Sequence, residues 1–308
     1  MSRQRSGEQA FTCTDGVTCS ARNLSGQWTE IRHFLCRDLF FYLSDVLMWR
    51  YIVSAAADGA TNMAIDHALA LHANQSAYPT LRIYRWQPAC LSIGAFQPYS
   101  DVNVAACEQA QIEIVRRPTG GRAILHDAEL TYSVTAPNSN PLLGGRVLST
   151  YRTISHGLLV GLRQLVSSVD WASGASDAPK SAACFDTPSD FELTVAGRKL
   201  VGSAQTRTRG AILQHGTVLL HADHQQLSKV LHLPAELDAA ALAERLIALD
   251  EAAQRPISFD EAQQAIVAGF ASAFNITLQP DQLTDQEQAS AERLRAERYS
   301  NPAWLQRR

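Results

Sequence analysis

Residues Arg116 to Asp127, which read RRPTGGRAILHD, form the first segment that could hold a substrate. The two glycines follow a β-rich run and let backbone amides approach a ligand closely, while Arg117 supplies fixed donors for a carbonyl, carboxylate or phosphate. The segment lacks the GK[ST] and GxGxxG patterns, so it is neither a P-loop nor a dinucleotide fingerprint. We expect a ligand-holding loop, and an ordinary Gly-Gly hairpin with solvated arginines is the alternative.

A lysine in the segment from Gly197 to Gln205, GRKLVGSAQ, could act as a base. Lys199 is one of only three lysines in a chain with 27 cationic side chains. Unlike an arginine, a lysine can lose its proton when it is desolvated. The residues that follow on the same β-rich run, Gly202, Ser203 and Ala204, are small and leave room for a ligand chain against the backbone.

A cysteine lies in the polar segment ACFDTPS, fifteen residues before Lys199. A loop that folds back over the intervening hairpin could bring Cys184 and Lys199 together. A neighbouring ammonium favours the reactive thiolate, and such a pair would attack thioesters. A buried or incidental thiol is the alternative interpretation of Cys184.

A histidine follows on the next β-rich run, in the segment Gln214-His215-Gly216-Thr217. The segment again places polar residues beside a glycine. Taken alone, His215 is more readily explained as a structural histidine than as a catalyst.

The composition restricts the class of protein. The 308 residues are 46% hydrophobic and 19% charged, with a formal net charge of −3. No run reaches the roughly 18 apolar residues of a spanning helix, and the near-neutral balance argues against a phosphate-contacting nucleic-acid binder. The six cysteines include no Cys-x-x-Cys pair, so we expect free thiols in a reducing cytoplasm and no metal site. Small molecules or proteins are the expected partners.

The pattern of the chain changes near Met48. Residues 1–47 show no sustained period, and we expect a loosely held, poorly ordered extension without a secretory signal. Residues 48–308 predict a folded domain that opens with a strand and a helix capped by Thr61 or Asn62.

Within residues 48–308, β-rich and helical patterns alternate. We expect strands at 81–86, 89–94, 112–117 and 123–137, helices at 101–111 and 149–166, three β segments around the lysine, and a mostly helical part from about 225 with one strand at NITLQP. This order predicts an α+β (α/β) fold with a mixed, largely antiparallel sheet flanked by helices.

Taken in order, the segments resemble the biotin/lipoate protein ligase and lipoyl/octanoyl transferase family over most of residues 48–308. RRPTGGRAILHD matches the RRxxGGxxxxHD loop of that family, and GRKLVGSAQTR followed by GAILQHGTVLL matches its lysine strand and the strand after it. The resemblance implies the catalytic-domain fold of the biotin/lipoate protein ligases, with a medium-chain acyl group held in a tunnel near the lysine.

The run CFDTPSDFELTVAGRKLVGSAQTR is similar to one branch of the family, the octanoyltransferases that carry a nucleophilic cysteine. The resemblance implies that Cys184 is the acyl-accepting nucleophile and that Lys199 is its activating partner. The substrate-binding residues that it implies are Arg117, Gly120, Gly121, His126, Gly202, Ser203, Ala204, His215 and Gly216.

The implied reaction has two steps. Cys184 accepts an octanoyl group from octanoyl-acyl carrier protein, and a lysine of the glycine-cleavage H protein or of a lipoyl domain of a 2-oxoacid dehydrogenase then takes it as an amide. Lys199 moves protons in both steps, provided that apolar surroundings favour its neutral amine. A thioester exchange followed by amide formation needs no ATP, cofactor or metal.

Three other functions fit the same segments. An ATP-dependent lipoate ligase would use Lys199 and would not need Cys184. An amidotransferase that moves octanoyl between lipoyl domains would use the same cysteine with another donor. A binding module would keep the tunnel without turnover.

Overall fold

The computed structural model describes residues 11–14, 18–22, 28–31, 48–172 and 191–307. The chain divides into two compact units, Met1–Leu47 and Met48–Arg308. The described part of the first unit is an antiparallel sheet of three short strands in sequence order, β1 (Phe11–Thr14), β2 (Thr18–Arg22) and β3 (Trp28–Ile31). The sequence pattern gave no indication of these strands.

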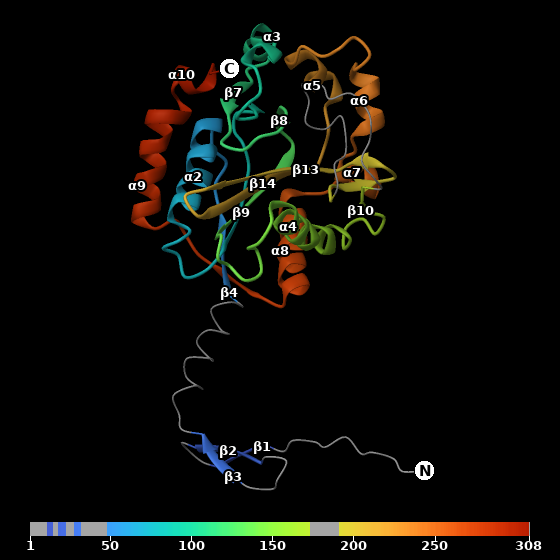
Figure 1. Ribbon diagram of the computed structural model, residues 1–308. Helices are drawn as coiled ribbons and strands as arrows, with labels where there is room; N and C mark the ends of the chain where they lie inside the picture. The colour runs from blue at the N-terminus through green and yellow to red at the C-terminus, as the bar shows by residue number, and fades with distance from the viewer. Residues whose placement is uncertain (1–10, 15–17, 23–27, 32–47, 173–190, 308) are drawn as a thin grey trace. The chain divides into compact units, whose positions relative to one another are not determined.

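A six-stranded mixed sheet forms the centre of the second unit (Figure 1). Its order is β13-β14-β9-β5-β4-β15. The two pairings that involve β4 are parallel and the other three are antiparallel, which confirms the predicted mixed, largely antiparallel sheet. The strand bounds are β4 (Met48–Val53), β5 (Thr80–Tyr84), β9 (Glu129–Pro137), β13 (Val201–Thr208), β14 (Ala211–Leu219) and β15 (Thr277–Pro280).

The central strand β9 shows how the sequence assigns the two faces of this sheet. Its residues alternate between polar and apolar, as in ELTYSVTAP, yet nearly all of them are buried. Leu130, Tyr132 and Val134 face the main hydrophobic core, whereas Glu129 and Thr131 point to the opposite face. Polar residues are therefore buried on one face, where they must find hydrogen-bond partners.

Helices cover both faces of the sheet (Figure 1). The main core packs the apolar face against α4 (Val147–Leu162) and α8 (Phe259–Phe274). The polar face receives α2 (Gly59–His72), which packs in turn against α9 (Asp285–Leu294). Asp58, rather than the expected Thr61 or Asn62, caps α2 by accepting a hydrogen bond from the Thr61 amide. The helix thus starts one turn earlier than predicted.

Two smaller sheets complete the framework of the site. One has the order β7-β6-β8, with β6 (Cys90–Ile93), β7 (Glu113–Arg116) and β8 (Ile124–His126). The other is antiparallel and consists of β10 (Asp170–Trp171), β11 (Leu193–Val195) and β12 (Arg198–Lys199). The expected strand 123–137 is interrupted by a turn at Asp127–Ala128, so that β8 and β9 belong to different sheets.

The remaining elements are short. They are η1 (Tyr99–Asp101), α3 (Val104–Gln109), α5 (His224–Val230), α6 (Ala239–Arg245), α7 (Leu249–Ala253), η2 (Arg295–Tyr299) and α10 (Pro302–Leu305). The expected helix at 101–111 is therefore reduced to α3. Across the described ranges, no helix has both the length and the apolar character needed to cross a membrane.

Candidate active site

A small cavity, with a volume of about 10 Å³, lies between the polar face of the large sheet, the small sheet β7-β6-β8 and helix α2. Twelve residues line it: Met63, Tyr84, Trp86, Ser92, Arg117, Ile124, His126, Thr131, Ala204, His215, Gly216 and Thr217. Five of these were predicted from the sequence as substrate-binding residues, namely Arg117, His126, Ala204, His215 and Gly216. The fold thus brings together residues from the loop, lysine-strand and histidine segments.

His126 links one side of the cavity to the sheet through two short hydrogen bonds. Its Nδ1 lies 2.7 Å from Oε1 of Glu129, and its Nε2 lies 2.7 Å from Oγ of Ser92. The Glu129 carboxylate can only accept, so Nδ1–H donates to it and Nε2 accepts from the Ser92 hydroxyl. The His126 ring also stacks on Trp86, with the ring centroids 4.0 Å apart.

His215 is held in the same way on the neighbouring strand. Its Nδ1 lies 2.9 Å from Oδ2 of Asp66, and its Nε2 lies 2.7 Å from Oγ1 of Thr119. Burial lowers the pKa of His215 in spite of the nearby Asp66 carboxylate. Burial opposes the charged form of Asp66 as well, but the Arg82 charge and the hydrogen bond with His215 lower the pKa of that carboxyl below its usual value. A neutral His215 that donates to an ionised Asp66 satisfies both groups.

The polar side chains around the cavity are hydrogen-bonded to one another, which gives the cavity an apolar character. Trp86 also donates its indole N–H to Thr131, and Thr217 lies within 3.2 Å of both His126 and Glu129. Because the side-chain polar atoms that line the space bind one another, little hydrogen-bonding capacity is left for a polar ligand. The lining of this small cavity therefore suits an apolar group.

Arg117 stabilises the Gly-Gly loop. Its guanidinium donates to the carbonyls of Ser92, Gly120 and Arg122 and to the Thr119 hydroxyl. We expected Arg117 to offer its N–H donors to a ligand, whereas in the structure these groups of the protein accept them. The loop also depends on its glycines, because Gly121 has φ +90° and its carbonyl oxygen lies so close to Gly94 that a Cβ on Gly94 would clash with it.

Lys199 is buried on β12, directly before β13, and has an acidic partner. Its Nζ lies 2.7 Å from Oε1 of Glu192, and the two side chains are 1% and 5% exposed. We expected apolar surroundings that favour a neutral amine, whereas the structure places a carboxylate against it. Glu192 therefore supports the alternative role, in which an ammonium stabilises a nearby thiolate.

Cys184 lies outside the described residues, so its position relative to Lys199 stays a prediction. The two cysteines Cys90 and Cys107 are buried, and burial raises the pKa of both thiols, to about 11 for Cys107. A raised pKa disfavours the thiolate. Neither thiol is therefore suited to be the nucleophile.

Other predicted residues lie near the cavity without lining it. Gly202 pairs with Thr217 across the β13–β14 ladder, beside the lining residues. Ser203 points to the opposite face, where its hydroxyl lies 2.7 Å from that of Tyr132. Gly120 and Gly121 shape the loop that Arg117 holds.

Several residues of the site could not be identified from the sequence. Met63 and Asp66 come from α2, Trp86 follows β5, and Glu129 and Glu192 are the buried acids that pair with His126 and Lys199. Among them, only Glu129 could have been found from its position in the sequence, because it closely follows the His126-Asp127 pair that ends the loop motif. No group of three possible metal-ligating side chains occurs in the part of the chain that the structure describes.

The chain belongs to the family described as lipoyl protein ligase A/B catalytic domain, whose model matches residues 58–271. This assignment confirms the family resemblance seen in the sequence motifs.

Relatives that align over nearly their whole length are octanoyltransferases named LipM. The protein from Brevibacillus brevis is 44% identical over 273 residues, which cover 84% of this chain and 99% of the relative. The protein from Bacillus subtilis is 38% identical, with coverages of 84% and 98%.

Solved structures of lipoate ligases share the fold. A lipoate-protein ligase A bound with ATP superposes with a TM-score of 0.72 at 25% identity, covering 84% of this chain and 98% of that one. A putative lipoate protein ligase from T. acidophilum with bound lipoic acid gives a TM-score of 0.70 at 24% identity, covering 84% and 100%.

Proposed function

We propose that this protein is an octanoyltransferase of lipoate assembly that moves an octanoyl group to a lysine of an acceptor protein. The observation that carries the proposal is an apolar cavity whose polar lining is internally paired, next to the strand that follows a buried lysine. The similarity to octanoyltransferases over 84% of the chain supports the same reaction class.

In the first step, the Cys184 thiolate attacks the carbonyl carbon of an octanoyl thioester. A C–S bond forms to Cys184, the C–S bond to the donor breaks, and the donor thiolate takes up a proton. One thioester replaces another, so the exchange needs no external energy source. We propose octanoyl-acyl carrier protein as the donor.

In the second step, the neutral amine of an acceptor lysine attacks the enzyme thioester. An amide bond forms, the bond to the Cys184 sulfur breaks, and the amine proton leaves through a base at the site. We propose a lipoyl domain or the glycine-cleavage H protein as the acceptor. A related archaeal structure is described together with its E2 lipoyl domain, which supports this acceptor class.

Lys199 and Glu192 are proposed to act on Cys184 as a unit. The carboxylate holds the ammonium in place, and the ammonium lowers the free energy of the Cys184 thiolate. Proton transfer by Lys199, which we predicted from the sequence, is compatible with the same geometry if Glu192 takes part in the exchange. We propose that an acyl chain that enters at this cavity is oriented with its carbonyl toward Cys184.

The fold shared with an ATP-bound lipoate-protein ligase A favours a second function, an ATP-dependent ligase that activates free lipoate. The two functions differ in their energy source. We expect transfer from octanoyl-acyl carrier protein to an apo lipoyl domain without ATP, and no lipoate-dependent exchange of pyrophosphate into ATP. Exchange that persists in Cys184→Ala, with no ATP-independent transfer, would establish the ligase.

A further inference from the structure

We propose that Trp304 and Arg116 are positioning residues, which fix the Gly-Gly loop beside the cavity by holding the backbone segment 94–97. The proposal rests on the proposed function, since a fixed loop matters for transfer only if the substrate binds beside it. Trp304 lies on α10, far along the chain from the loop motif, and no sequence motif includes it.

Arg116, the first arginine of the RRPTGG motif, is fully buried and joins two segments that are distant in the sequence. Its Nη1 lies 2.8 Å from the Gly94 carbonyl oxygen and 2.6 Å from that of Gln97. Its Nε lies 2.8 Å from the carbonyl oxygen of Leu305, at the end of α10. Because a guanidinium presents its N–H donors in one rigid plane, this side chain sets the segment 94–97 relative to α10.

Trp304 completes the connection from the side of α10, which lies beside β7 (Figure 1). Its indole N–H donates to the Arg116 carbonyl at 2.8 Å. The guanidinium carbons of Arg298 and Arg307 each lie 3.6 Å from the centre of the Trp304 ring, a distance at which two such groups fit only on opposite faces. Arg307 also donates to the Ala95 carbonyl at 3.1 Å. The indole therefore keeps a second arginine on the same backbone segment.

The segment 94–97 in turn contacts the Gly-Gly loop. Its only large apolar side chain, Phe96, is 85% exposed and anchors it little. The Ala95 amide donates to the Thr119 carbonyl at 2.8 Å. A Cβ on Gly94 would lie 2.0 Å from the Gly121 carbonyl oxygen, so the two backbones are in direct contact. A shift of the segment is therefore passed on to the loop.

The loop carries this contact to the cavity. The Thr119 hydroxyl lies 2.7 Å from Nε2 of His215, and Arg117 lines the cavity directly. Rates of group transfer are sensitive to small displacements of the reacting groups. Loss of Trp304 should therefore slow transfer, although Trp304 itself is not among the residues that line the cavity.

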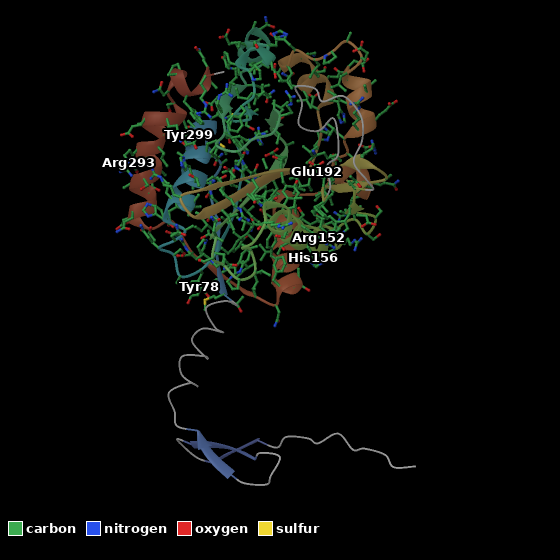
Figure 2. The ribbon with its side chains drawn as sticks, viewed as in Figure 1. Tyr78, Arg152, His156, Glu192, Arg293 and Tyr299 are labelled. Atoms are coloured by element: carbon green, nitrogen blue, oxygen red, sulfur yellow. The ribbon has the colours of Figure 1, made fainter. Side chains whose placement is uncertain are left out.

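The test compares Trp304→Ala and Trp304→Phe with the control Tyr299→Phe. Alanine removes the stacking and the indole hydrogen bond, whereas phenylalanine keeps a ring between the two arginines. Tyr299, labelled in Figure 2, loses only the hydroxyl that contacts His67, so its variant measures the effect of lower stability in the same region. Two rates are measured: hydrogen exchange of the Ala95 amide, and single-turnover loading at saturating octanoyl-acyl carrier protein.

We expect Trp304→Ala to exchange the Ala95 amide roughly tenfold faster and to load about tenfold more slowly than wild type. Trp304→Phe should restore both rates to within about threefold of wild type, because the stacking remains. Tyr299→Phe should match wild type in both rates.

Exchange or loading at the wild-type rate in Trp304→Ala would overturn the proposal, as would equal effects of Trp304→Ala and Tyr299→Phe. If Trp304→Ala does not fold, Arg307→Ala decides the question, since it removes one stacked arginine and the bond to Ala95. We expect faster exchange of the same amide and loading slowed about threefold, and an unchanged value of either would reject the positioning role. Failure of the wild type to load would instead reject the proposed function, whereas the Ala95 exchange, which needs no substrate, would still show whether α10 fixes the loop.

Discussion

The buried pair of Lys199 and Glu192 is the most informative contact at the scale of single residues. An ion pair removed from water is favourable only with good geometry, and the 2.7 Å separation provides it. Removing one partner leaves the other charge buried. Glu192, which is labelled in Figure 2, lies immediately before the hairpin of β11 and β12 that carries Lys199. The pair therefore stabilises this hairpin and, in the proposed function, also affects the reactivity of Cys184.

Replacing Glu192 by glutamine should affect both stability and chemistry. We expect Glu192→Gln to lower the free energy of unfolding by about 3 kcal/mol, and to slow octanoyl loading by roughly 10- to 100-fold because the Lys199 ammonium is misplaced. Denaturant unfolding and single-turnover loading measure the two effects. The control is Glu251→Gln, which removes the half-exposed partner of Arg198 and should cost less than about 1 kcal/mol. Loading at the wild-type rate in Glu192→Gln would show that Lys199 does not need its partner.

Lys199 could be identified from the sequence and Glu192 could not. Lys199 is a rare residue type within a recognisable motif, whereas Glu192 is an ordinary acid on a short β-rich run. Their contact depends on the antiparallel pairing of β11 with β12, which is a tertiary feature. Similarly, Asp66 becomes a site residue only because α2 packs on the polar face of the sheet.

A second residue-scale effect concerns His67, on the side of α2 that contacts Tyr299 (Figure 2). Burial lowers the pKa of His67 to about 4. The unfolded chain binds a proton at this residue below about pH 6.5, and the folded chain does so only near the lowered value. Stability from His67 is therefore full above that unfolded pKa and is lost as the pH falls.

We predict that His67→Gln flattens this pH dependence. Between neutral pH and a pH near 4.5, wild type should lose about 2 to 3 kcal/mol more unfolding free energy than the variant loses. Urea unfolding at the two pH values measures the difference. The same loss in both proteins would mean that His67 is protonated in the folded state.

At the scale of elements, α4 and α8 cross unusually closely beneath the large sheet. A Cβ on Gly269 would lie 2.3 Å from the Gly161 amide nitrogen and 2.6 Å from the Gly157 carbonyl oxygen. Backbone atoms cannot yield as a flexible side chain can. This crossing presses both helices onto the apolar face of β9 and β14 and so supports the strands that carry the site.

Gly269→Ala should separate the two helices. Alanine favours an isolated helix by about 1 kcal/mol over glycine, yet we expect a net loss of about 2 to 3 kcal/mol because the clash is with backbone. Thermal or denaturant unfolding tests this prediction. Ser272→Ala, at an exposed position of the same helix, should change stability by less than about 0.5 kcal/mol. A Gly269→Ala protein as stable as wild type would show that the crossing can relax.

At the scale of the whole catalytic unit, the mixed sheet, the flanking helices and the order of the motifs were predictable, because periodicity and turn residues are local signals. The turn that moves β8 into a second sheet could not be predicted, since Asp127 and Ala128 resemble ordinary strand residues. That turn shapes the cavity, because it sets His126 on one sheet and Thr131 and Thr217 on the other. The architecture thus forms a small, apolar-lined cavity between two sheets.

The central claim is that Cys184 carries the octanoyl group during transfer. Incubation with octanoyl-acyl carrier protein, followed by intact-mass analysis, tests it most directly. We expect the wild-type chain to gain one octanoyl group that hydroxylamine removes, and Cys184→Ala to gain none. An octanoyl adduct of equal extent on Cys184→Ala, or transfer to a lipoyl domain by that variant at the wild-type rate, would contradict the account.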